Sequence, residues 1–237
     1  MSTLRKKYIL PAICVFITVE AVLCILIQVI GGRANSIISF LSIVLCFAFH
    51  LLFFKRDIFW ILTQIGLLTT VCADCFLVLL SPREQLLGML FFSVTQICYF
   101  MRIYFSQTSK KEQLLHVLLR LGCIVLIIAI TVLILGKSTD ALAIISVIYY
   151  ANLIVNIIYA FRQGKEYRIF AIGLLLFSLC DLSVGLSVLD EIYIKIPNES
   201  FLYRIVHPGF NLAWLFYVPS QALIALSNIK KITLQSA

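Results

Sequence analysis

Residues 169–189 read IFAIGLLLFSLCDLSVGLSVL, and this stretch contains one charged side chain, Asp181. A transmembrane helix needs about 20 mostly apolar residues. With this stretch, eight such runs occur along the chain: 8–30, 37–54, 58–80, 86–105, 114–136, 141–161, 169–189 and 209–227. Backbone polar groups in a bilayer must be satisfied within each span, so the runs predict helices. We therefore expect an all-α membrane protein, a bundle of eight transmembrane helices that forms a single domain over residues 1–237.

The overall composition agrees with a membrane protein. Hydrophobic residues make up 62% of the chain and charged residues only 13%, whereas a soluble domain carries about 25% charged residues. The first run follows Arg5, Lys6 and Lys7 but has no small-residue cleavage site, so we interpret it as a retained span rather than a signal peptide. All eight cysteines fall inside predicted spans. Buried cysteine behaves as a small hydrophobe, so neither a disulfide framework nor a metal site is predicted.

The distribution of Lys and Arg predicts the orientation, because cytoplasmic loops carry an excess of both. Of the nineteen Lys and Arg, five lie on the side opposite the amino terminus and the other fourteen lie on its own side. The five are Arg33, Arg83, Lys137, Lys195 and Arg204. Both termini should be cytoplasmic, in a multi-pass protein of the cell (plasma) membrane if the chain is bacterial. The net charge of +8 then reflects topology, and no nucleic-acid partner is expected; the oligomeric state is open.

Three of the eleven acidic residues lie inside apolar runs: Glu20, Asp74 and Asp181. A charged Asp at the centre of a bilayer costs roughly 2.5–3.5 kcal/mol on insertion scales. Such a group is usually paired, neutralised or turned toward the protein interior, and it is a functional-site hypothesis by default. The three acids are therefore the first candidates for a site.

Polar side chains follow helical spacing on five of the runs, which places them on shared faces. The stripes are Thr63, Thr70 and Asp74; Ser93, Gln96 and Tyr99; Tyr149, Asn152, Asn156 and Tyr159; Ser178 beside Asp181; and Asn211, Trp214, Tyr217 and Gln221. Any one stripe is typical of hydrogen bonding between helices. Together with the acids, the five stripes favour a polar pocket in the outer half of the bundle, shared by Asp74 and Asp181. Glu20 has no comparable stripe, and we assign it no catalytic role.

Two carboxyl groups in one apolar pocket can hold a single proton between them. Glycosidases use such a pair for acid–base chemistry through a cationic transition state. The histidines, His50, His116 and His207, lie near helix ends or in a loop, so none is placed to activate a serine or cysteine nucleophile. The sequence also contains no Walker loop, H-E-x-x-H motif or Rossmann fingerprint. We expect no cofactor and no metal.

Several motifs occur in the order of a known family. They are Ala73-Asp74-Cys75-Phe76-Leu77, Leu87-Gly88-Met89-Leu90-Phe91-Phe92, Gln96-Ile97-Cys98-Tyr99, the block from Gly173 to Asp181, and the block from Phe216 to Ala225. This pattern resembles the YhhN/TMEM86 family of integral membrane proteins. Ala73 stands where the family has Gly, Gln96 where it has His, and Asn35-Ser36 where a Lys-Pro often opens the second span.

The resemblance implies lysoplasmalogenase activity, in which water cleaves the vinyl ether of a lysoplasmalogen to give a fatty aldehyde and a glycerophospho-base. It implies Asp74 and Asp181 as the catalytic pair, without saying which is the acid. The expected partners are a lysophospholipid substrate and membrane lipids. The side chains expected to bind the substrate are Gln96, Tyr99, Asn152, Ser178, Tyr217 and Gln221.

Buried acids also serve as proton relays and ion sites. A proton- or ion-coupled transporter, or a lipid-binding membrane protein without catalysis, is therefore the alternative hypothesis, and Glu20 would suit a relay. Transporters often contain internal repeats and broken helices. This sequence has no evident repeat, and its one proline in the middle of a span is Pro219.

Overall fold

The computed structural model describes residues 3–53, 55–80, 83–193 and 195–229, and within these residues it contains helices and no strands. The long helices are α1 (Thr3–Val29), α2 (Gly32–Leu52), α3 (Ile58–Asp74), α4 (Gln85–Tyr104), α5 (Lys110–Leu135), α6 (Ala141–Arg162), α7 (Arg168–Val188) and α9 (Leu212–Leu226). The short ones are the π-helical turns η1 (Cys75–Leu79) and η4 (Leu189–Tyr193), the 3-10 turns η2 (Gly136–Ser138) and η3 (Lys165–Tyr167), and α8 (Phe201–Val206). The all-α class predicted from the sequence is confirmed.

Seven helices within the described residues are long and apolar enough to cross a membrane, and they coincide with the first seven predicted runs. The eighth run became α9, which has only 15 residues. At 1.5 Å per residue it is about 22 Å long, shorter than a hydrocarbon core of about 30 Å. Seven helices are therefore long enough to be membrane spans, and α9 is too short to qualify as an eighth by length. Lys230 and Lys231, which contribute to the predicted orientation, lie outside the described residues.

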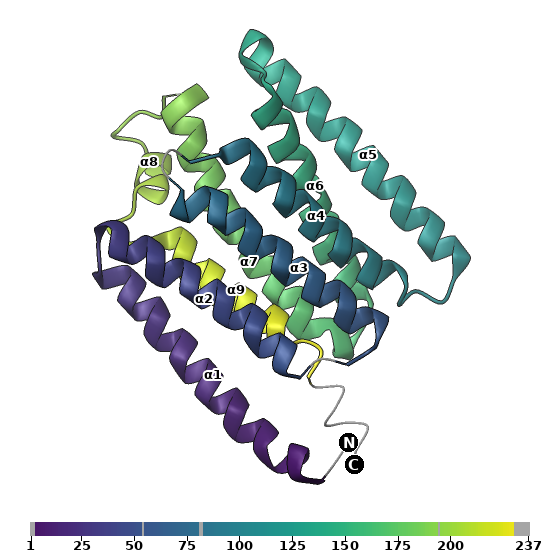
Figure 1. Ribbon diagram of the computed structural model, residues 1–237. Coiled ribbons are helices and arrows are strands. Elements are labelled where there is room, and N and C mark those ends of the chain that lie inside the picture. Colours follow the sequence, from purple (N-terminus) through teal and green to yellow (C-terminus); the bar gives the residue numbers. More distant parts are fainter. Residues whose placement is uncertain (1–2, 54, 81–82, 194, 230–237) are drawn as a thin grey trace.

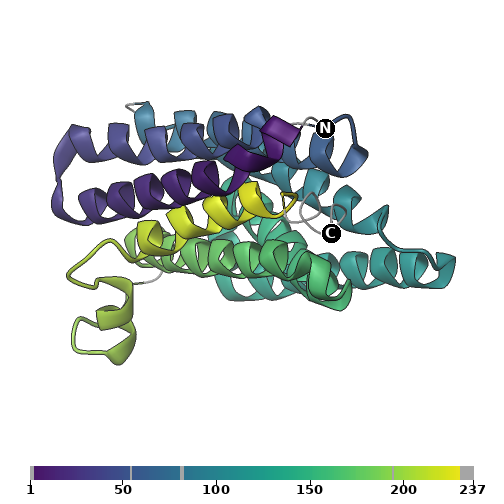
Figure 2. The same ribbon diagram turned by 90° about the horizontal axis from the view of Figure 1, so that it is seen from below.

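Six of the helices form a closed ring. Going around it, the order is α2, α3, α4, α6, α7 and α9, and α9 returns to contact α2. The other two long helices pack outside the ring, α1 against α2 and α9, and α5 against α6. In Figure 1, α1 and α5 lie at opposite edges of the bundle. Figure 2 shows α9, in yellow, lying between α1 and α2 on one side and α7 on the other. The interior of the ring is the core of the protein.

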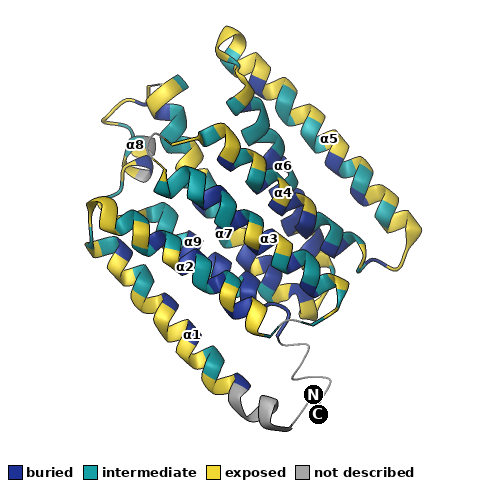
Figure 3. Ribbon diagram, in the orientation of Figure 1, coloured by how far each residue is buried: buried dark blue, intermediate teal, exposed yellow. Residues whose placement is uncertain are grey.

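The two outer helices have the surfaces expected of helices that face lipid. Figure 3 shows exposed residues along much of α1 and α5. Large aliphatic side chains on these helices are open to the surroundings, with Val29 77% and Leu133 83% exposed. A helix that is apolar all round belongs in a membrane or a large core, and these two have no protein covering most of their surface. The structure is that of a multi-pass membrane protein.

The helices α7 and α9 pack closely in the ring, and a glycine permits this approach. A Cβ atom added to Gly173 would lie 2.9 Å from Cγ1 of Ile224 and 3.1 Å from the backbone oxygen of Ser220. Small residues allow helix backbones to approach closely inside membranes. Gly185, on the same helix, has open space around the corresponding position. The two glycines therefore differ in the packing that they support.

We expect Gly173→Ala to separate α7 from α9 and to lower the thermal unfolding temperature in detergent. Overpacking of this kind typically costs about 1–3 kcal/mol, and each kcal/mol corresponds to roughly 2–4 °C in a chain of this size. Gly185→Ala is the matched control, and it should leave the temperature unchanged or raise it, because alanine favours helix. Equal shifts for the two variants would contradict the packing described for α7 and α9.

Candidate active site

Asp74 is the last residue of α3, and its side chain points into the ring. It is 3% exposed. The hydroxyl of Tyr217, on α9, donates a hydrogen bond to its Oδ2 atom at 2.7 Å. Tyr217 is itself buried, so this bond connects α3 and α9 within the core.

Asp181 makes the same kind of contact on the other side of the ring. It lies on α7, and its Oδ2 atom accepts a hydrogen bond from the hydroxyl of Tyr149 on α6. Tyr149 is buried, whereas Asp181 is partly exposed. The sequence motifs gave no role to Tyr149. Its position on the polar stripe with Asn152 and Asn156 was the signal that could have identified it.

Two phenylalanines lie between the tyrosine–aspartate pairs. The ring centroid of Phe92, on α4, is 5.8 Å from that of Tyr149 and 6.4 Å from that of Tyr217. The centroid of Phe177, on α7, is 5.4 Å from that of Tyr217 and 6.5 Å from that of Tyr149. The four rings form one aromatic cluster, and two of its hydroxyl groups, those of Tyr217 and Tyr149, bond to Asp74 and Asp181. The fold thus brings together the two aspartates that lie 107 positions apart in the sequence.

Two buried amides lie one helical turn away from this cluster. Gln221 follows Tyr217 on α9, is 0% exposed, and neither its Oε1 nor its Nε2 atom has a hydrogen-bond partner among the described residues. Gln96 follows Phe92 on α4; its Oε1 atom accepts from Asn156 at 2.9 Å, but its Nε2 atom has no such partner. A buried polar group left unpaired costs about 1–3 kcal/mol. These amides are therefore available to hydrogen-bond a bound molecule.

The other predicted binding residues contact other residues of the protein. Ser178 donates to the backbone oxygen of Leu175 at 2.9 Å, and Asn152 accepts a hydrogen bond from Arg120. The ring of Tyr99 packs edge-on against Phe170, with centroids 5.3 Å apart, but its buried hydroxyl has no hydrogen-bond partner among the described residues. The contacts of Asn152 and Ser178 are typical of helix–helix packing, whereas the hydroxyl of Tyr99, like the two amides, is available to hydrogen-bond a bound molecule.

Glu20 lies apart from the two aspartates, between α1 and α2. It is 3% exposed and accepts hydrogen bonds from Oγ of Ser42 at 2.5 Å and from Sγ of Cys46 at 3.4 Å. Both donors come from α2, so the carboxyl group attaches the outer helix α1 to the ring. The sequence gave no reason to assign Glu20 a catalytic role, and the structure places it outside the aromatic cluster that holds the two aspartates.

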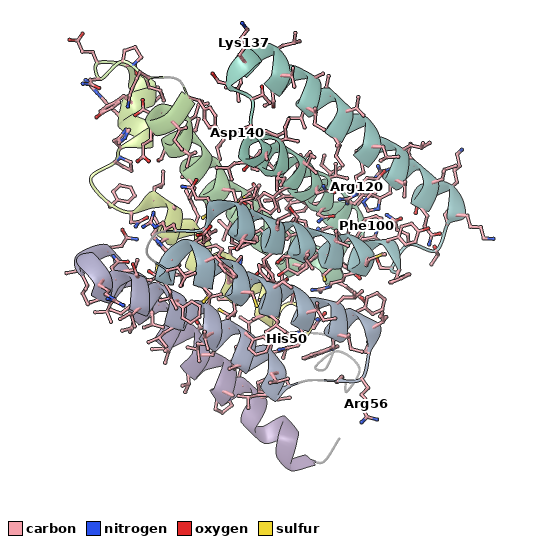
Figure 4. The ribbon with its side chains drawn as sticks, turned by 45° about the horizontal axis from the view of Figure 1, so that its top comes forward. His50, Arg56, Phe100, Arg120, Lys137 and Asp140 are labelled. Carbon is pink, nitrogen blue, oxygen red and sulfur yellow. The ribbon has the colours of Figure 1, made fainter. Side chains whose placement is uncertain are left out.

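The structure also buries two arginines that the sequence placed among the cytoplasmic charges. Arg102 is 3% exposed, donates to the hydroxyls of Thr63 at 2.8 Å and Ser227 at 2.9 Å, and lies 3.9 Å from the ring centroid of Phe170. Arg120 bonds to side-chain oxygens of α6 and lies 4.2 Å from the ring centroid of Phe100, an arrangement visible in Figure 4. Neither forms an ion pair with a carboxylate among the described residues. Their partners are neutral oxygens, aromatic faces and, for Arg120, Nε2 of His116 at 3.2 Å.

The fold and the site define a multi-pass α-helical membrane protein with two tyrosine–aspartate pairs in its core. The sequence profile of the YhhN family matches residues 34–228, and the chain belongs to that family. The matched region covers five ring helices completely and α2 from Ala34 onward. It does not include α1. Searches of curated proteins and of solved structures found no match.

Proposed function

We propose that this protein is an intramembrane hydrolase of the lysoplasmalogenase type. Its substrate would be a lysoplasmalogen, and its products a fatty aldehyde and glycerophosphoethanolamine or glycerophosphocholine. Membership of the YhhN family is consistent with this activity. The observation that carries the proposal is the pair of aspartates, Asp74 and Asp181, each bonded to a tyrosine on either side of one aromatic cluster.

The reaction needs only an acid, a base and water. One aspartate in its protonated form gives its proton to the β-carbon of the vinyl ether, and the positive charge then spreads over the α-carbon and the ether oxygen. The other aspartate, ionised, stabilises this oxocarbenium ion and takes a proton from the attacking water. The second aspartate, now protonated, then gives its proton to the glycerol oxygen of the hemiacetal, and the bond from that oxygen to the acetal carbon breaks to release the alcohol. The first aspartate, now ionised, takes the proton of the hemiacetal hydroxyl, and the alkyl part leaves as the aldehyde. One water is consumed and both aspartates return to their initial state.

The surroundings of the aspartates suit this chemistry. Each tyrosine bonds to Oδ2, and Oδ1 of each aspartate accepts no hydrogen bond from another described residue. One oxygen of each carboxyl group is therefore oriented and the other is available for proton transfer. The faces of Phe92 and Phe177 can stabilise a nearby positive charge through cation–π attraction. Gln96 and Gln221 supply buried polar groups that can hydrogen-bond a bound molecule.

We also propose the finer topology that accompanies this function: a single domain of eight spans, with α9 as the eighth, and both termini cytoplasmic. Burial of α9 against α7 and α2 would allow a helix shorter than the hydrocarbon core to pass through the protein interior. The home membrane would be the plasma membrane in a bacterial cell.

The proposed orientation can be tested with two variants that each carry a single cysteine, one in place of Lys137 and one in place of Arg56. These two residues lie at opposite ends of the bundle in Figure 4. In a cysteine-free background, an impermeant thiol reagent added to intact cells should label the first and not the second; the reverse result would contradict the orientation.

Substitution of either aspartate should abolish aldehyde release. Purified protein in detergent is supplied with lysoplasmalogen, and aldehyde is measured by a coupled dehydrogenase. We expect Asp74→Asn and Asp181→Asn each to slow the reaction roughly 100-fold or more, the usual contribution of a general acid or base. Glu20→Gln is the matched control, because Glu20 is a buried acid outside the aromatic cluster, as exposed as Asp74, and it should retain activity.

Two results would contradict the hydrolase proposal. One is an absence of aldehyde with the unaltered protein, and the other is full activity in both aspartate variants. Proton-coupled solute uptake in proteoliposomes that fails in Glu20→Gln would instead favour the transporter hypothesis.

The tyrosines should contribute less than the aspartates. We expect Tyr149→Phe and Tyr217→Phe each to reduce kcat by about 10-fold, since each removes one hydrogen bond to a catalytic carboxyl group. Tyr159→Phe is the control: this tyrosine is also buried, but its hydroxyl has no partner among the described residues. A loss in Tyr159→Phe equal to that in the other two would show that the effect comes from general disturbance of the core.

A further inference from the structure

A recess of about 710 Å³ opens at the end of the bundle where α2 begins and η1 ends. The side chains that line it include Arg33, Ser36 and Ile37 from α2, Val78 and Leu79 from η1, and Arg83. Pockets that hold small molecules usually have volumes of about 300–1,000 Å³. We call this feature the arginine recess.

The arginine recess lies close to the candidate active site along the chain. The π-helical turn η1 starts directly after Asp74, and Val78 and Leu79 follow it by four and five residues. At 1.5 Å per residue, the recess begins about 6 Å beyond Asp74 along the helix axis. Single π-helical turns occur frequently at functional sites, and here the turn forms one wall of the recess.

Two cations gather at this recess although cations are scarce at this end of the molecule. The sequence supplies five Lys and Arg to this side, and the fold brings two of them, Arg33 and Arg83, to the same cavity. Its lining contains no carboxylate, and neither arginine forms an ion pair with a described residue. Lys137 lies elsewhere at the end of α5 (Figure 4). Two unpaired guanidinium groups beside aliphatic side chains suit an anion that carries an apolar part.

We infer that the arginine recess binds the phosphate of the lysophospholipid headgroup while the vinyl ether lies between Asp74 and Asp181. This inference rests on the proposed function and adds a headgroup subsite to it. Guanidinium groups bind phosphate oxygens in bidentate fashion. In the substrate, five bonds of about 1.5 Å separate the vinyl ether oxygen from phosphorus, an extended reach of roughly 6 Å. This reach is similar to the rise of about 6 Å along the helix from Asp74 to Val78, the first residue of η1 that lines the recess.

The lining also has a consequence for specificity. Because it offers no acidic side chain for an amine, the recess should select for the phosphate and not discriminate between ethanolamine and choline.

The experiment measures binding separately from turnover. The full-length protein, purified in a neutral detergent, is titrated with a 1-O-alkyl lysophosphoethanolamine, whose saturated ether cannot be hydrolysed by the proposed reaction. Arg33→Ala and Arg83→Ala should each weaken binding roughly tenfold, as expected for loss of a charge-assisted hydrogen bond. Lys137→Ala is the matched control, since it removes an exposed cation from the same end of the bundle; its binding should not change.

Two further ligands identify what the recess recognises. A 1-O-alkyl glycerol, which lacks the phosphate, should bind the arginine variants as well as the unaltered protein. Inorganic phosphate should compete poorly, because it lacks the alkyl chain. Competition by inorganic phosphate as strong as that by the lysophospholipid would overturn the lipid assignment in favour of free phosphate. Equal weakening by Lys137→Ala would overturn the site in favour of a general surface-charge effect.

The outcome can be separated from that of the proposed function. If the arginine variants bind the alkyl lysophospholipid normally and release aldehyde with unchanged KM, the headgroup subsite is wrong and the hydrolase stands. If the unaltered protein binds this ligand through both arginines but releases no aldehyde from lysoplasmalogen, the subsite stands and the hydrolase is wrong.

Discussion

The structure depends on one constraint: a polar group in hydrocarbon must find its hydrogen-bond partner inside the protein. Each of the three acids inside the apolar runs meets it with a donor from another helix. Asp74 bonds to Tyr217 and so connects α3 to α9, and Asp181 bonds to Tyr149 and so connects α7 to α6. Glu20 connects α1 to α2 in the same way. The contacts that satisfy the candidate catalytic groups are thus also contacts that hold the six-helix ring together.

The same constraint governs the buried cations, with a different solution. Arg102 and Arg120 bond to hydroxyl and amide oxygens and lie on aromatic rings. Among the described side chains, neither arginine pairs with Asp74 or Asp181. A guanidinium group beside a carboxylate would hold it in the ionised form, which would remove the acid from an acid–base pair. Separation of the acids from the arginines therefore preserves the proton chemistry that the proposed reaction requires.

Gln96, which stands where the family pattern resembled by the sequence has histidine, is part of this neutral network. It accepts a hydrogen bond from Asn156, and Asn156 in turn accepts one from Arg120. The side-chain amides of Asn156 and Gln96 therefore connect the buried Arg120 to a position one helical turn after Phe92. Gln96 cannot carry a proton as histidine can. The acid–base work of the proposed mechanism consequently rests on the two aspartates, and Gln96 can orient a ligand.

The sequence alone determined the all-α class and the positions of seven spans, because apolar length acts locally along a helix. It also identified Asp74 and Asp181 as candidates, because the cost of a charge inside an apolar run is local too. It did not reveal the ring, the pairing of Asp181 with Tyr149, or the burial of Arg102. Hydrophobic periodicity tells which face of a helix is polar, but it does not tell which helix that face meets. The tertiary packing determines which helices meet. Because Gly173 has no side chain, α9 can pack closely against α7, and this packing brings residues that are far apart in the sequence around one aromatic cluster.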